Sequence, residues 1–203
     1  MGLFLSATAV RHAPADDVAK VVESWCSDHF VVCTEVTGRD VPSGNRVDVH
    51  APVDGWTTVL WPPYFIPYVE VAVHLSASLG RVVSAVNVHD SDCWQQVLVD
   101  RGEVVDRYAT DPRYLASDPE PVEVVAPRWR GDPETVAALL GCRARDVARH
   151  YRRNRHDRTF DDWGFVALWA DEGITYPDVP SGAHTTFALG EDWFDVLNRV
   201  LRP

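Results

Sequence analysis

A short acidic segment with one histidine holds the residue types most typical of catalysis. His89, Asp90 and Asp92 directly follow an apolar run that ends at Val88. Two carboxylates at the open end of a strand can bind Mg²⁺ or Mn²⁺, and a nearby imidazole can act as a general base. Aspartate and serine are also favoured in β-turns, because their side chains bond the local backbone. We therefore predict a turn here, and treat His89, Asp90 and Asp92 as the candidate catalytic residues.

Other patterns for catalysis or metal binding are missing from the sequence. His150 and His156 have no cysteine or carboxylate pair at the spacing of a zinc site. There is no serine nucleophile elbow, phosphate-binding loop, H-E-x-x-H or dinucleotide fingerprint. The four cysteines form no C-x-x-C pair, which favours ordinary buried thiols in a reducing compartment. We predict no metal and no cofactor, and the sequence leaves open whether the protein is an enzyme.

Aromatic residues are the second group that could bind something. The chain has eight tryptophans, and a loop rich in rings and prolines runs from 61 to 65. Tryptophan and tyrosine anchor both ligands and protein partners, whereas a proline-stiffened connection could equally cover the edge of the core. The candidate ligand- or partner-binding residues are Trp56, Trp61, Tyr64, Phe65 and Trp94.

A cluster of arginines stands out in a chain whose net charge is −11. Residues 133–153 resemble a helix-turn-helix, with Gly141 at the turn, although any helical hairpin with a glycine turn has this pattern. The acidic charge elsewhere argues against nucleic acid and anionic membranes as partners. The alternative is a solvated helix face that is partly paired with the protein's own carboxylates. The basic patch comprises Arg143, Arg145, Arg149, Arg152 and Arg153.

The periodicity of apolar residues predicts the elements that position these side chains. Helices are expected after Pro14 and over 68–79, where Gly80 supplies a left-handed stop. Two further helices flank Gly141, and another precedes the C-terminus. Residues 160–172 fit a helix and a strand about equally well. Strands are predicted over 3–10, 30–36, 46–50, 56–61, 81–89, 93–99, 103–108 and 184–189.

This order of elements predicts an α+β protein. Residues 1–115 would form an antiparallel or mixed sheet of about five to six strands with two helices on one face, in the ferredoxin-like order β-α-β-β-α-β-β. A Pro- and acid-rich connector would follow over 116–130. A mainly helical region, 131–203, would pack on the sheet, either as a separate part or within one single domain.

The sequence does not determine a function, and three hypotheses remain. The favoured one is an acidic binding protein, either a regulator, an accessory subunit or an immunity-type protein that takes a protein partner. The alternative is a small metabolic or biosynthetic enzyme with a carboxylate and histidine site in an aromatic-lined pocket for a small-molecule ligand. DNA binding through 133–153 is the third. We expect a cytoplasmic protein, because no signal peptide and no apolar run of membrane-spanning length is present.

Overall fold

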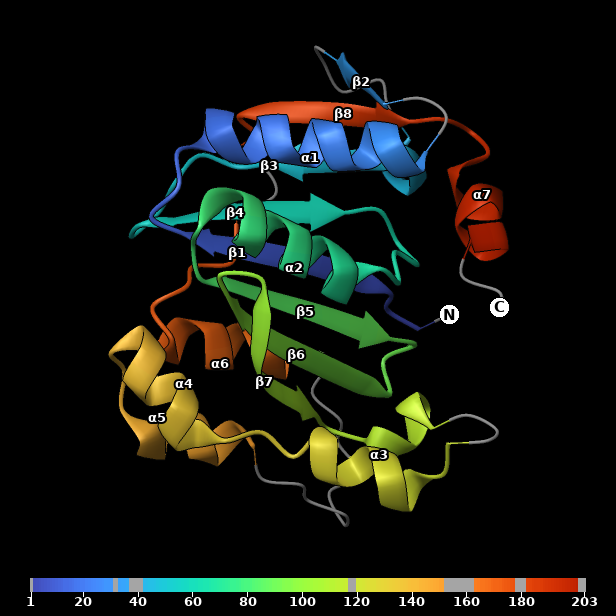
Figure 1. The fold of residues 1–203 in the computed structure, drawn as a ribbon. Helices are drawn as coiled ribbons and strands as arrows, with labels where there is room; N and C mark the ends of the chain where they lie inside the picture. Colours follow the sequence, from blue (N-terminus) through green and yellow to red (C-terminus); the bar gives the residue numbers. More distant parts are fainter. Residues whose placement is uncertain are drawn as a thin grey trace.

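The computed structural model describes residues 2–30, 33–36, 42–116, 120–151, 163–177 and 182–200. Strands and two helices make up the first part of the chain, and most of the later elements are helices (Figure 1). In chain order they are β1 (Leu5–Arg11), α1 (Ala15–His29), β2 (Cys33–Val36), the 3-10 turn η1 (Ser43–Asn45), β3 (Arg46–Val49), β4 (Trp56–Trp61), α2 (Tyr68–Leu79), β5 (Val83–His89), β6 (Cys93–Asp100), β7 (Glu103–Ala109), the 3-10 turn η2 (Pro112–Leu115), α3 (Val122–Arg128), α4 (Pro133–Leu140), α5 (Ala144–His150), α6 (Gly164–Asp171), β8 (Thr185–Leu189) and α7 (Trp193–Val200).

Within the described residues, the strands form one antiparallel sheet of eight strands, in the order β2-β8-β3-β4-β1-β5-β6-β7. Helices cover both of its faces. Helix α2 connects β4 and β5, which have β1 between them, whereas α1 connects β1 and β2, which are separated by β4, β3 and β8. The tight β6–β7 hairpin forms as its sequence predicts, with Gly102 in the left-handed region at the turn.

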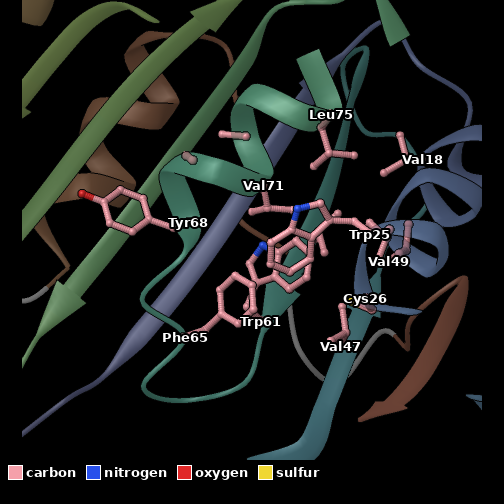
Figure 2. Close-up of a cluster of buried hydrophobic side chains, with 14 of the residues drawn as sticks. Val18, Trp25, Cys26, Val47, Val49, Trp61, Phe65, Tyr68, Val71 and Leu75 are labelled. Carbon is pink, nitrogen blue, oxygen red and sulfur yellow. The ribbon is translucent and has the colours of Figure 1, made fainter. Parts of the chain in front are cut away.

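The first core lies between the sheet and the pair α1 and α2 (Figure 2). The apolar residues of α1 recur at helical spacing, so Val18, Val22 and Trp25 share the face that packs on the sheet. Helix α2 ends at Gly80, whose φ of +62° is the left-handed conformation that glycine adopts at little cost. A hydrogen bond joins two neighbouring strands in this core: the Trp61 indole donates to the Thr8 hydroxyl over 2.9 Å.

A second core lies on the opposite face of the sheet. The helical hairpin of α4 and α5 turns at Gly141 and buries Val136, Leu140 and Val147. Helix α6 adds further apolar side chains, of which Trp169 is fully buried. These helices pack on the strands β1, β5, β6 and β7. Residues 164–171 are therefore helical, which resolves the ambiguity between helix and strand in their sequence.

The predicted fold class was wrong about the sheet. It has eight strands rather than five or six, and helices pack on both faces rather than on one. One reason is β8, which comes from the region expected to be mainly helical and pairs with both β2 and β3. Another is that α4, α5 and α6 are needed to cover the second face of β5, β6 and β7. Residues 122–128, which lie within the predicted connector, form α3.

The lengths of the helices also bear on membranes. In the part of the chain that the structure describes, no helix combines the length and the apolar character needed to cross a membrane.

Candidate functional site

Two of the segments that the sequence singled out meet at one end of the sheet. His89 is the last residue of β5, and Tyr64 lies in the loop between β4 and α2. The ring of Phe4, just before β1, lies between them. Its centroid is 4.2 Å from that of Tyr64 and 5.1 Å from that of His89.

The row of rings continues on both sides of this trio. His89 is followed by Tyr114 of η2, at 5.7 Å between centroids, and Tyr64 by Phe194 of α7, at 6.1 Å. We call this row, Phe194–Tyr64–Phe4–His89–Tyr114, the aromatic ladder. Its rings come from five separate segments, all on the right-hand side of the molecule in Figure 1.

The aromatic ladder is open to solvent. Tyr64 and Tyr114 are each 45% exposed and Phe194 is 42% exposed, and the His89 side chain is exposed as well. Single exposed aromatic residues are common on protein surfaces. A continuous row of rings from separate segments needs an explanation that single exposed rings do not, because a small change in each loop could have buried its ring. Such rows are typical of surfaces that bind a partner.

The backbone under the aromatic ladder is fixed and strained. The Leu3 amide donates to the Ser91 hydroxyl over 2.7 Å, and the Ser91 amide donates to the Leu3 carbonyl over 3.1 Å. These bonds tie the first residues of the chain to the turn after β5. Tyr64, Asp90 and Ser91 all have φ between +51° and +66°, a region that costs energy for residues other than glycine. Strain of this kind is commonly found at functional sites.

Carboxylates lie at the Tyr114 end of the aromatic ladder. The Tyr114 hydroxyl donates to the Asp92 carboxylate over 2.7 Å, and this hydrogen bond raises the pKa of Tyr114 to about 12. The phenol therefore stays neutral at physiological pH and holds the Asp92 carboxylate in place. Asp90 is exposed in the same turn. A cation that contacts this surface would meet both aromatic faces and negative charge.

Most of the other aromatic candidates are in the core. Trp56, Trp61, Phe65 and Trp94 are each no more than 5% exposed. Trp61 and Phe65 stack with centroids 4.4 Å apart, directly below the loop that carries Tyr64. These four residues therefore belong to the two cores, and Tyr64 is the member of the predicted set that reaches solvent.

The arginines that the sequence singled out are largely paired with acids. Arg143 contacts Asp146 within its own helical turn, and Arg149 contacts Asp171 at the end of α6. Arg145 lies 3.7 Å from the Asp146 carboxylate. Arg152 and Arg153 lie outside the described residues. Paired guanidinium groups have less to offer DNA phosphates, so the surface of α5 gives the DNA-binding hypothesis little support.

Neither a known protein family, nor a curated protein, nor a solved structure matches the chain. Its function must therefore be argued from its own residues. In the described part of the chain, no three side chains of the metal-binding types come together. His89, Asp90 and Asp92 do share one turn, and their catalytic role stays a prediction.

A second group of polar side chains is buried beneath α6. The Gln96 amide donates to both carboxylate oxygens of Glu172, at 2.9 and 2.7 Å, and to the Ser84 hydroxyl at 3.0 Å. The Tyr151 hydroxyl lies 3.0 Å from Gln96 Oε1 and 3.0 Å from Asp106 Oδ2. Burial raises the pKa of Glu172 to about 8 and also raises the pKa of Asp106. We call this group the buried network.

Sequence reasoning found two residues of the aromatic ladder, Tyr64 and His89, and missed the other three. Phe4, Tyr114 and Phe194 stand alone in their segments, with no motif around them. Only the pairing of the strands brings these segments together, so a local signal could not have identified them.

Proposed function

We propose that this protein is an acidic binding protein that uses the aromatic ladder to hold a protein partner, as a regulator, accessory subunit or immunity-type protein would. The observation that carries the proposal is the unbroken row of five rings, of which four are exposed and Phe4 is half-buried. Rings supply large contact areas at a low cost in side-chain entropy, which is why tyrosine in particular dominates binding surfaces.

Charge favours a basic partner. The whole chain carries −11, and Asp90 and Asp92 lie beside the rings. Arginine side chains stack on tyrosine and phenylalanine faces and pair with carboxylates, so a surface rich in arginine would complement both features. A negative field over the molecule would also speed its encounter with such a partner. A cytoplasmic location fits this proposal and stays a prediction.

Affinity capture from the native host, with two matched variants, tests the proposal. The first variant combines Tyr64→Ser and Phe194→Ser in the aromatic ladder. The control combines Val53→Ser and Val124→Ser, which are apolar, similarly exposed at 49% and 44%, and not part of the aromatic ladder. We expect one protein to be retained in a fixed ratio by the wild type and the control and lost by the first variant. Removing each ring should cost about 2 kcal/mol of binding, or about thirtyfold in Kd.

Two results would count against this proposal. A partner that the ladder variant retains as well as the wild type does would place the binding surface elsewhere. A bound metabolite, in the absence of any protein, would instead favour the enzyme hypothesis with His89, Asp90 and Asp92.

A further inference from the structure

A small cavity lies along β7, the edge strand on the opposite side of the sheet from β2. Its volume is about 160 Å³. Three arginines line it, together with two aspartates and a glycine: Arg107, Arg128, Arg130, Asp106, Asp132 and Gly131. Three guanidinium groups around one cavity are unexpected in a chain of net charge −11.

The cavity forms where the chain returns along the edge of β7. The Ala109 amide donates to the Trp129 carbonyl over 3.0 Å, and Tyr108 and Arg130 form a single antiparallel bridge. The Asp132 amide then donates to the Asp106 carboxylate over 2.7 Å. Arg107 therefore comes from the strand, and Arg130 from the segment that lies along it.

A glycine fixes the position of this returning segment. Gly131 has a φ of +72°, and an added Cβ would lie only 2.4 Å from the Tyr151 ring. Only glycine lets the backbone pass this close to the ring in this conformation. The Tyr151 hydroxyl in turn contacts Asp106, so the wall of the cavity is connected to the buried network.

The two acidic side chains that line the cavity already accept hydrogen bonds within the protein. Asp106 accepts hydrogen bonds from the Asp132 amide and the Tyr151 hydroxyl. Asp132 caps α4, where it accepts from the Glu134 amide and from Thr135.

Of the three arginines, only one forms an ion pair within the described residues. Arg128 pairs with Glu120 over 2.6 Å, whereas Arg107 and Arg130 make no ion pair there. Arg130 interacts electrostatically with Asp132, which lines the same cavity, but within the described residues neither Arg107 nor Arg130 is held in a close ion pair.

We propose that this cavity binds an oxyanion, such as a phosphate group, between Arg107 and Arg130. The planar guanidinium group donates two parallel hydrogen bonds, a geometry that matches phosphate and carboxylate oxygens. The volume suits one such group with a few waters. The negative charges of Asp106 and Asp132 keep the affinity for an anion modest. We therefore expect the cavity to hold a free anion at millimolar concentration, or the anionic part of a larger molecule. This site is independent of the aromatic ladder.

Calorimetric titration with inorganic phosphate tests the proposal, with acetate as a carboxylate probe at matched ionic strength. The site variant is Arg107→Gln with Arg130→Gln. The control is Arg101→Gln with Arg145→Gln, which removes the same charge from two exposed arginines outside the cavity. We expect the wild type and the control to bind phosphate equally, and the site variant to bind at least about tenfold more weakly.

The possible outcomes separate clearly. Phosphate binding that exceeds acetate binding supports a phosphate ligand, and equal binding of both supports an oxyanion site for carboxylates as well. The same phosphate affinity in the site variant and the control would show that only net charge matters, and would overturn the proposal. An absence of binding to the wild type at millimolar phosphate would overturn it too.

Discussion

Glu172 is a carboxylic acid that is buried within the buried network. The donor that reaches its two oxygens is the Gln96 amide, and no cation forms an ion pair with Glu172 within the described residues. Charged or titratable groups around it come from several parts of the chain: Asp106 on β7, Tyr151 directly after α5, Cys142 between α4 and α5, and Asp171 at the end of α6. An ionised carboxylate would be costly there, so the folded state keeps Glu172 protonated at neutral pH.

The pH dependence of stability follows from this proton. Burial raises the pKa of Glu172 to about 8 from an ordinary value of 4.5. Between these pH values the folded state holds a proton that the unfolded state has lost, so the free energy of unfolding falls as pH rises, by roughly 1 kcal/mol per pH unit from this group. We expect Glu172→Gln to remove that slope and to be more stable than the wild type at pH 8. Urea unfolding at several pH values measures this, and parallel slopes in both proteins would refute it.

At the scale of the elements, local patterns predicted much of the structure. Gly80 and Gly141 end α2 and α4 as expected, and both glycines have positive φ. Other segments were harder to predict. The range 116–130, predicted as a connector, contains α3, which has Pro121 directly before it and Pro127 inside it. In α6, large apolar residues are so frequent that their spacing in the sequence shows no clear helical period. Tertiary packing therefore determines that this segment is a helix.

Arg11 connects two elements that are far apart in the sequence. Its guanidinium, at the end of β1, donates to the carbonyls of Leu139 and Leu140 at the C-terminus of α4, over 3.0 and 3.2 Å. It also lies 5.9 Å from the centre of a Trp56 ring. A cation here satisfies carbonyls that a helix end leaves unpaired and complements the helix dipole.

Replacing this side chain should weaken the contact between β1 and the helical hairpin. We expect Arg11→Ala to lower the free energy of unfolding by about 1–3 kcal/mol, because charged hydrogen bonds to α4 are lost. The exposed Arg145→Ala, as the control, should change it by less than about 0.5 kcal/mol. Chemical denaturation of both variants gives the comparison, and equal effects would mean that Arg11 does not secure α4.

At the scale of the whole molecule, the two cores share one sheet. Strand β8 lies between β2 and β3, and its register pairs Glu35 with Phe187 and Val47 with Phe187. Such pairings join residues more than a hundred positions apart, and no local pattern encodes them. For this reason the sequence could predict strands individually but neither the eight-stranded sheet nor the meeting of the rings of the aromatic ladder.

This topology makes a prediction about the division of the chain. A fragment of residues 1–115 lacks β8, so β2 loses the partner to which it is paired, and it also lacks the helices that cover Trp94, Leu98 and Tyr108. We expect this fragment to show no cooperative thermal unfolding and few dispersed amide signals in its NMR spectrum. A fragment that folds cooperatively would instead support a separate sheet domain.

We propose that the aromatic ladder is where a protein partner binds. Photo-crosslinking tests it most directly, with benzoylphenylalanine placed at Tyr64 in cells of the native host and, as a control, at Val53, which is 49% exposed at the opposite end of β4. We predict one defined protein adduct from position 64 and none of it from position 53. No adduct from position 64, or the same adduct from both positions, would contradict the claim.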